Sequence, residues 1–181
     1  MTTATTALAA GIWAGDPIHS GISFKVRQMG IGKVRGAFAL SSAVLTVNDG
    51  GRVSAVIDAA SVHTGNGRRD QHLRSAGFLD VDKYPTIEFA STGVRGFSGG
   101  TFTLAGELTL HGVTRAVQLE TEFFGVTAGP SGGQRTGFSA ATRISRAAFG
   151  VGTRSGFGAV IGDAIEVAIE IEFTAGGSDQ R

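Results

Sequence analysis

Cysteine is absent from this chain of 181 residues, and proline, charge and long apolar runs are scarce. Without cysteine the protein cannot have a disulfide framework, a thiolate metal site or a cysteine nucleophile. Charged residues make up 17% of the chain, and 16 Lys and Arg against 15 Asp and Glu give a net charge of +1. This balance leaves no electrostatic footprint for nucleic acid or for an anionic membrane surface, so we expect no nucleic-acid partner.

Membrane and export signals are also missing from the sequence. No stretch reaches the roughly 18 uninterrupted apolar residues of a spanning helix, so we expect no integral membrane segment. Residues 1–11 have neither a basic start nor an apolar run of the length that a signal peptide needs, which predicts a cytoplasmic location. We expect residues 1–11 and 176–181 to be flexible.

Glycine is abundant, with 29 residues, while only 3 prolines are present and 41% of the chain is hydrophobic. A chain of this length with this apolar content predicts one domain with a substantial core. Glycine combined with apolar sequence indicates strands joined by many turns rather than a disordered segment.

Alternation of apolar and polar residues with period two is the dominant pattern, and it predicts strands with one buried face. The eight predicted strands are 20–28, 35–47, 52–60, 86–95, 101–110, 113–123, 136–146 and 165–173. Short glycine-rich turns between several of them indicate antiparallel neighbours. The fold class is therefore all-β, and a closed antiparallel barrel is favoured because closure removes exposed strand edges.

One segment departs from the alternation and predicts a short helix. Residues 67–77 contain good helix formers between two glycines, and residues 78–81 are expected to continue as a second turn. On this helix Arg68 and Arg69 lie on the same side as His72. Such a basic side near a helix N-terminus suits a phosphate or carboxylate, although a solvated face with an Arg–Asp pair explains the pattern equally well.

The interior of an eight-stranded barrel is either filled by side chains or wide enough for one small ligand. The inward positions mix large residues such as Phe24 and Phe38 with small ones such as Gly106 and Ala140. Periodicity alone does not reveal a void, and by itself it favours a filled core.

Catalytic and metal-binding patterns are weak. The histidines His19, His63, His72 and His111 lie in separate segments without the spacing of a zinc site, so no metal is predicted. His19 and Ser20 stand beside Asp16, but neighbouring residues on a strand point to opposite faces, which makes a catalytic triad awkward. The glycine-rich stretches 65–70 and 150–159 match no phosphate-binding motif and are interpreted as turns or a loop.

Five segments in order resemble the YceI-like, polyisoprenoid-binding family over about residues 12–174. They are Trp13-x-x-Asp16-Pro17-x-His19-Ser20-x-Ile22-x-Phe24-x-Val26-Arg27, Met29-Gly30-x-x-Lys33-Val34-Arg35-Gly36-x-Phe38, Arg69-Asp70-x-His72-Leu73-Arg74-Ser75-x-x-Phe78-Leu79-Asp80, Gly106-x-Leu108-Thr109-Leu110-x-Gly112-Val113-Thr114 and Arg135-x-Gly137-Phe138-x-Ala140. Tyr84-Pro85 and Phe89-x-Ser91 follow the third segment.

The resemblance implies a lipocalin-like, extended eight-stranded barrel over residues 12–175 that binds a polyisoprenoid or a similar long-chain amphiphile without catalysis or a cofactor. It also implies a role in carriage or storage, and dimers are common among relatives. Gln28 departs from the histidine that relatives usually have, which weakens any headgroup role there. The expected lipid-contacting residues in the lumen are Phe24, Val26, Phe38, Leu40, Phe89, Phe102, Leu104, Leu108, Phe138, Ala140, Ile169 and Ile171. The headgroup candidates are Arg68, Arg69 and His72.

Two other functions compete with this interpretation. One is a lipid- or quinone-modifying enzyme that uses His19, His72 and Asp70. The other is a structural barrel whose ligands are opportunistic.

Overall fold

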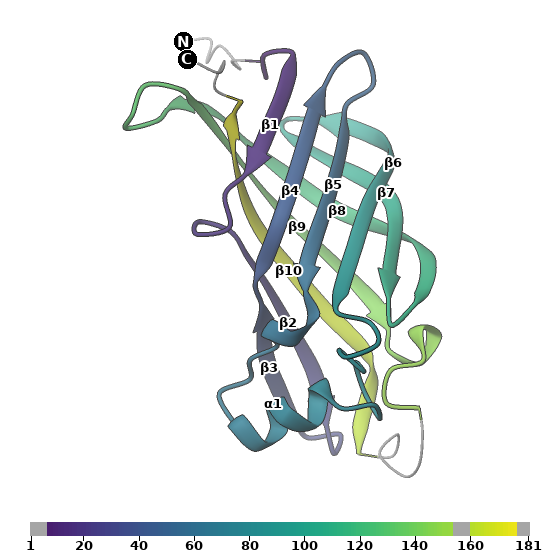
Figure 1. Ribbon diagram of the computed structural model, residues 1–181. Coiled ribbons are helices and arrows are strands. Elements are labelled where there is room, and N and C mark those ends of the chain that lie inside the picture. Colours follow the sequence, from purple (N-terminus) through teal and green to yellow (C-terminus); the bar gives the residue numbers. More distant parts are fainter. Residues whose placement is uncertain (1–6, 154–159, 177–181) are drawn as a thin grey trace.

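The computed structural model describes residues 7–153 and 160–176, and most of these residues lie in ten antiparallel strands (Figure 1). The strands are β1 (Gly11–Gly15), β2 (Gly21–Gln28), β3 (Gly32–Phe38), β4 (Leu40–Val47), β5 (Arg52–Asp58), β6 (Thr86–Ser98), β7 (Thr101–Leu110), β8 (Val113–Ala128), β9 (Gln134–Ser145) and β10 (Ile161–Ala175). The described part also contains one α-helix, α1 (Gly67–Arg74), and two 3-10 turns, η1 (Ala59–Ser61) and η2 (Ala147–Phe149). Most of the two ends predicted to be flexible, residues 1–6 and 177–181, lies outside the described residues.

Eight of the strands close into a barrel, as the sequence predicted. They follow the order β1, β4, β5, β6, β7, β8, β9 and β10, and the circuit closes because β1 pairs with β4 on one edge and with β10 on the other. Trp13 lies opposite Leu45 on β4 and Ala175 on β10. Within residues 7–153 and 160–176, no helix is both long enough and apolar enough to cross a bilayer.

The β2–β3 hairpin extends the sheet beyond the closed ring. Strand β10 pairs with β1 through Phe173–Ala175 and with β2 through its earlier residues, so one edge of β10 serves both strands. In Figure 1 the hairpin lies at the lower end of the barrel beside α1. A single bridge between Ala37 and His63 joins β3 to the segment before the helix.

Strand boundaries differ from the predicted ones where the chain changes its pairing partner. The predicted strand 35–47 is divided at Ala39, because β3 pairs with β2 whereas β4 pairs with β1 and β5. The predicted strand 52–60 ends at Asp58, whose side chain accepts a hydrogen bond from the Ala60 N–H (2.9 Å) and caps η1. Strand β1 was not predicted, since five residues are too few to show alternation.

The predicted helix is present, but it ends at Arg74. Asn66 caps its N-terminus by accepting the Arg69 N–H (3.0 Å), and the Ser75 backbone at its C-terminus is extended. Arg74 then holds the helix to the barrel by donating to the carbonyl oxygens of Ala60 (2.7 Å) and Val62 (3.0 Å). Residues 78–81, predicted as a further helical turn, form a sequence of turns instead, and Asp80 there has a positive φ of 50°.

The solid part of the core lies at two places in the barrel. Trp13 and Phe173 are buried where β1 closes onto β10, and the Trp13 indole N–H donates to the Ala9 carbonyl (3.0 Å). Val62, Phe78 and Phe149 are buried around α1 and η2. Buried residues of the barrel wall, among them Leu40, Ile57 and Ile87, connect these groups into one cluster.

Two phenyl rings lie directly against glycine backbone in the barrel wall. A Cβ on Gly36 would lie 2.3 Å from the Phe24 ring, and a Cβ on Gly106 would lie 2.4 Å from the Phe89 ring. Any side chain at either glycine would therefore displace a ring that faces the lumen. The two glycines are required by this close approach, since neither has a positive φ.

Candidate functional site

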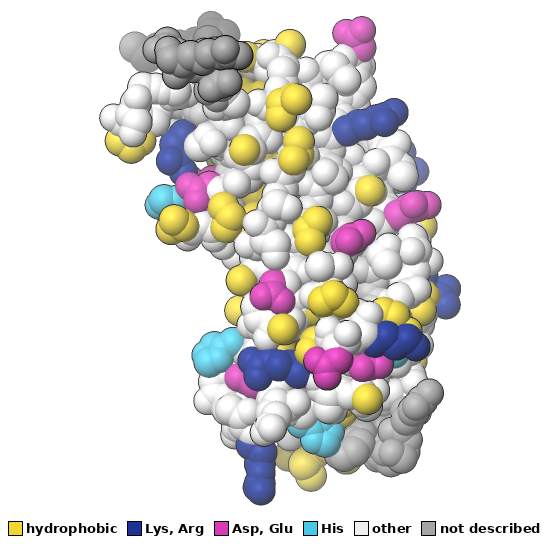
Figure 2. Space-filling model, viewed as in Figure 1, with side chains coloured by type: hydrophobic (Ala, Val, Ile, Leu, Met, Phe, Trp, Pro, Cys, Tyr) yellow, Lys and Arg dark blue, Asp and Glu magenta, His cyan; other side chains and the backbone are white. Residues whose placement is uncertain are grey.

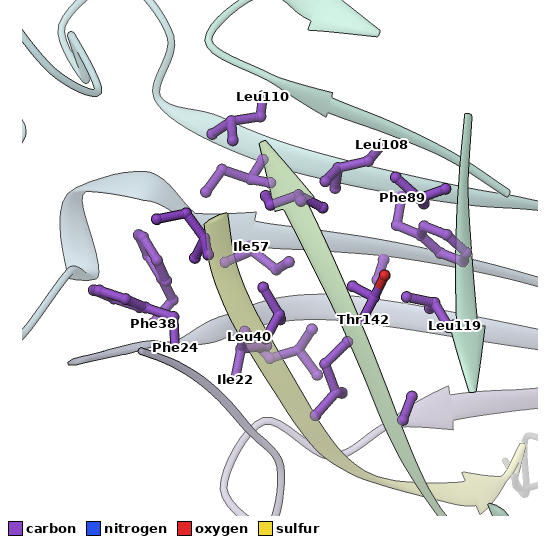
Figure 3. A pocket seen from close by; sticks show the side chains of 18 of the residues that line it. Ile22, Phe24, Phe38, Leu40, Ile57, Phe89, Leu108, Leu110, Leu119 and Thr142 are labelled. Carbon is purple, nitrogen blue, oxygen red and sulfur yellow. The ribbon is translucent and has the colours of Figure 1, made fainter. Parts of the chain in front are cut away.

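The barrel encloses an apolar cavity of about 990 Å³ (Figure 3). This volume lies at the upper end of the roughly 300–1,000 Å³ that is usual for ligand sites. Figure 3 shows side chains such as Ile22, Leu40 and Leu119 from facing strands, with Thr142 contributing a single oxygen among carbon atoms. The filled core that periodicity favoured is therefore wrong, because the inward side chains are too small or too widely spaced to meet across the barrel.

All twelve predicted lumen residues lie on the wall of this cavity. Only Val26, Leu40 and Ala140 among them are buried, and the other nine are partly exposed. An inward residue that remains accessible in a closed barrel faces empty space. The structure thus places these residues where a guest would contact them, and their contact with a lipid stays a prediction.

Phenyl rings line the cavity in a connected row. Phe138 stands at its centre, with ring centroids 5.3 Å from Phe123, 6.4 Å from Phe102 and 6.0 Å from Phe173. The Phe97 ring stacks on Phe102 at 5.6 Å. Phe123 was missed as a lumen residue, although its alternation with Glu122 marks it as inward.

The helix contributes wall residues that strand periodicity could not reveal. Leu73 and the following Phe78 and Leu79 line the cavity together with the three headgroup candidates Arg68, Arg69 and His72. The His72 ring meets the Phe78 ring edge-on with centroids 5.0 Å apart. The basic side predicted for the helix therefore faces the cavity.

Polar wall residues gather at the end of the cavity next to α1. Besides the helix residues they include Arg27 and Gln28 at the end of β2, Asn66 before the helix, and Arg146 after β9. Arg52 lines the cavity at the end of the barrel away from the helix. Glu170 is the one carboxylate residue among the described lining residues. This end of the cavity therefore favours negative over positive charge.

Arg146 is buried, with 7% of its surface exposed, and it is bound by backbone oxygens rather than by a carboxylate. Its Nη1 donates to the carbonyls of Val151 (2.8 Å) and Gly152 (2.9 Å). Its Nε and Nη2 donate to the carbonyls of Gly162 (3.2 Å) and Ile161 (3.1 Å). One guanidinium thus joins the segment after η2 to the start of β10. This role could not be predicted from the sequence, because backbone carbonyl acceptors leave no sequence pattern.

Asp70 and Arg69 have structural partners at the base of the helix. The buried Asp70 carboxylate accepts from the Thr64 hydroxyl (2.6 Å) and the Thr64 N–H (2.8 Å), and these bonds lower its pKa. Arg69 donates from Nε to the Thr64 hydroxyl (2.8 Å) and from Nη2 to the Thr64 carbonyl (3.0 Å). Of the helix arginines, Arg68 is therefore the one whose replacement tests the cavity with the least disturbance of the helix.

The three residues of the enzymatic alternative are not brought together. His72 lines the cavity, whereas Asp70 is buried against Thr64, with His63 Nδ1 3.3 Å from its Oδ2. His19 lies outside the barrel, where its Nδ1 is 2.7 Å from Asp16 Oδ2. Ser20 accepts the Glu172 N–H (3.1 Å) and lines the cavity, so it does not pair with His19 as a triad would require.

Asp16, His19, Arg135 and Glu172 form an ionic cluster on the outside of the barrel. Arg135 Nη2 lies 2.6 Å from Asp16 Oδ2 and 2.9 Å from Glu172 Oε2. In the described part of the chain, Asp16, His19 and Glu172 are the one group with metal-ligand geometry. Because a guanidinium already contacts both carboxylates, the cluster is explained as an ion-pair network that fastens the 16–20 turn to β9 and β10.

The hydrogen bond from His19, together with bonds from Arg135 and the Ile18 N–H, lowers the pKa of Asp16 from 3.8 to about 2. Because the folded pKa lies below the unfolded one, the cluster stabilises the fold above about pH 4, and this contribution is lost as the pH falls toward 2. We expect the urea midpoint of the wild type to exceed that of Asp16→Asn at about pH 5. The difference should shrink by about pH 2.5. A difference that stays constant over this range would contradict the assignment.

The fold and the cavity define a hollow antiparallel β-barrel of the lipocalin-like kind. The chain belongs to the YceI-like family, since the YceI-like domain matches residues 13–173. It is 35% identical over 155 residues to a UPF0312 protein of Vibrio parahaemolyticus, an alignment that covers 80% of this chain and 82% of the relative.

Two solved structures share the fold of this chain. The YCEI protein of Campylobacter jejuni superposes with a TM-score of 0.72 at 30% identity, covering 81% of this chain and 87% of that one. A polyisoprenoid binding domain from Saccharophagus degradans superposes with a TM-score of 0.64 at 17% identity, covering 91% of this chain and 98% of that one. The second comparison shows the shared fold.

Proposed function

We propose that the protein binds a polyisoprenoid or a similar long-chain amphiphile, without catalysis, with the tail in the barrel cavity. The observation that carries the proposal is an apolar cavity of about 990 Å³ with most of its polar side chains at the end next to α1. A long tail with one polar head has the same division into apolar and polar parts. The domain from Saccharophagus degradans, named as polyisoprenoid binding, has the same fold and supports this choice of ligand.

Burial of the tail supplies most of the binding free energy. Each buried CH₂-sized group contributes about 0.8 kcal/mol, so one five-carbon isoprene unit contributes about 3–4 kcal/mol before costs. Ordering the tail and associating the two molecules consume much of this gain. Selectivity should therefore follow chain length and branching more than the chemistry of the head.

The head is expected at the end of the cavity next to α1. Arg68, His72 and Arg27 lie there with the amides of Gln28 and Asn66. Guanidinium groups form strong charge-assisted hydrogen bonds with phosphate oxygens, so a phosphate or pyrophosphate head fits this end. Gln28 contributes an amide instead of a histidine, and it serves as a neutral hydrogen-bonding group.

Native mass spectrometry of the purified protein, followed by identification of whatever organic solvent extracts, tests the function directly. The expected result is one unmodified long-chain lipid per barrel. A chemically altered lipid released on incubation would support the enzymatic alternative. A barrel that takes up no added prenyl lipid would support the structural alternative, and either of these two results would overturn the proposal.

Replacement of Arg68 tests the position of the head. Arg68→Ala should weaken binding of farnesyl diphosphate roughly tenfold, because a charge-assisted hydrogen bond contributes about 1.5–3 kcal/mol. Binding of farnesol, which has the same tail and no charge, should change less than about twofold. Competition against a fluorescent fatty acid measures both affinities.

Arg143→Ala is the control for loss of one positive charge, because its side chain is 68% exposed and pairs with Glu166 on the outside of the barrel. It should leave both ligands unaffected. Equal losses for farnesol and farnesyl diphosphate in Arg68→Ala would remove the headgroup assignment while leaving tail binding intact.

A further inference from the structure

The tip of the β2–β3 hairpin exposes two large apolar side chains. Ile31 is 93% exposed and Met29 is 67% exposed, at the lower end of the barrel. The Met29 N–H donates to the carbonyl of Val160 (2.7 Å), which is itself 38% exposed. Single exposed apolar residues are common, but three that adjoin at one projecting point form a small apolar tip.

The turn that presents this tip is tight. Met29 and Gly30 both have positive φ angles, 51° and 70°, and the Ile31 N–H donates to the Gln28 carbonyl (3.3 Å). A methionine in the left-handed region is uncommon, since glycine and asparagine adopt it at lower cost. The chain thus keeps a large apolar side chain where a small polar one would suit the turn better.

Four cations stand behind the tip on one face of the hairpin, and one of them, Arg27, also borders the cavity. Lys25 lies opposite Arg35, and Arg27 lies opposite Lys33, so both cross-strand pairs are of like charge. Like charges placed opposite each other destabilise a strand pair. Residues 21–38 contain no Asp or Glu that would offset them.

The adjoining strand supplies little compensation. Glu166 on β10 lies beside Lys25, but its carboxylate is paired with Arg143 (3.3 Å). The net charge of +1 does not reveal this basic cluster, because it is summed over the whole chain. In Figure 2 hydrophobic side chains and a basic side chain lie at the lower tip of the molecule, with a histidine beside them and acidic side chains further up.

The opposite end of the barrel also exposes apolar residues, but in a different electrostatic setting. Phe97 is 61% exposed there and Val94 is 48% exposed, with Arg95 between them. Glu120 and Glu122 lie on the outer face of the same sheet, opposite Thr103 and Thr101. Carboxylates beside an apolar end repel an anionic surface, whereas the hairpin attracts one.

We infer that the β2–β3 hairpin docks on the surface of an anionic lipid bilayer. Met29 and Ile31 enter the interface between headgroups and acyl chains, and the four cations behind them contact the lipid headgroups. Val26, Gln28 and Val160 line the cavity as well, so docking brings the basic end of the cavity to the membrane. The docking inference depends on the hairpin alone. Transfer of a lipid between the bilayer and the cavity, in contrast, rests on the proposed function.

Co-sedimentation with vesicles tests the docking. The full chain should sediment with vesicles of 70% phosphatidylcholine and 30% phosphatidylglycerol. Binding should weaken between about 0.1 M and 0.5 M NaCl, because salt screens the contact. Vesicles of phosphatidylcholine alone should bind the protein at least roughly tenfold more weakly.

Matched variants at the two ends of the barrel locate the contact. Met29→Ser with Ile31→Ser should reduce binding to the mixed vesicles roughly tenfold or more, through loss of apolar burial. Lys33→Glu should reduce it by a similar factor through reversal of one charge near the surface. Ile12→Ser, at a residue that is 63% exposed and outside the cavity wall, and Arg95→Glu make the corresponding changes at the other end, and both should bind vesicles as the wild type does.

Three results would overturn the inference. The first is equal sedimentation with both kinds of vesicle, and the second is loss of binding in the Ile12 and Arg95 variants instead of the hairpin variants. The third is an ultracentrifuge experiment in which the Met29 and Ile31 variant converts a dimer to a monomer while vesicle binding is unchanged, which would assign the tip to a second copy of the chain. Lipid extraction from the same samples reports separately on the cavity, so docking and the proposed function can fail independently.

Discussion

Ala140→Trp should abolish uptake of a long-chain lipid while the barrel stays folded. Ala140 is a small residue on β9 whose side chain lies on the cavity wall, between Thr121 and Ile169 of the neighbouring strands. Ala140 is closely packed within the wall, with 9% of its surface exposed, so an indole there has room only toward the cavity and occupies the volume that the tail needs. Because burial of each isoprene unit contributes about 3–4 kcal/mol, exclusion of two units would weaken binding by several orders of magnitude. Native mass spectrometry with added prenyl lipid measures the loss.

Ala141→Trp is the matched control for this variant. Ala141 is the next residue on the same strand, it is exposed, and it lies on the outer face. The same indole there leaves the cavity unchanged, so lipid uptake should equal that of the wild type. Uptake of a full-length lipid by Ala140→Trp at wild-type levels would show that the tail binds elsewhere.

Arg146→Met should lower the free energy of unfolding by about 3–5 kcal/mol. Methionine fills similar space but leaves four carbonyl oxygens, those of Val151, Gly152, Ile161 and Gly162, without their donor. Each buried polar group that loses its partner costs about 1–3 kcal/mol, and only part of this is recovered by local relaxation. Urea denaturation at pH 7 measures the difference.

Arg143→Met, three residues earlier on β9, provides the comparison. Its guanidinium forms one exposed ion pair with Glu166, and such pairs contribute about 0–1 kcal/mol. Arg146→Lys should fall between the wild type and Arg146→Met, because a lysine retains the charge without the planar fork. If Arg146→Met were within about 1 kcal/mol of the wild type, the carbonyl cluster would not be the basis of stability at this end.

The sequence predicted the barrel wall well because period two is a direct physical consequence of strand geometry. Most lumen candidates, such as Phe102 or Ile169, alternate with a polar neighbour, and the two faces of the strand follow from that alternation. Strand β1, which closes the barrel, was not predicted from alternation because it spans only Gly11–Gly15. Strand pairing partners are also invisible to periodicity, which explains the missed division at Ala39.

The void and its basic end could be predicted only in part. A cavity depends on the distance between facing walls, and a pattern along one strand contains no information about that distance. Arg68 and His72 were found because they share one side of a helix, whereas Arg27 reaches the same end from β2 and Arg146 from the segment after β9. Their convergence is a property of the closed ring, and no local motif records it.

The contacts of Phe24 with Gly36 and of Phe89 with Gly106 help to set the width of the lumen. Because each glycine lacks a Cβ, the phenyl ring packs against the backbone of the neighbouring strand instead of projecting into the lumen. A methyl group at either position would tilt that ring inward and narrow the bore. The width available to a guest is thus governed by residues that never touch it, and relatives can differ in bore through changes beneath the lining alone.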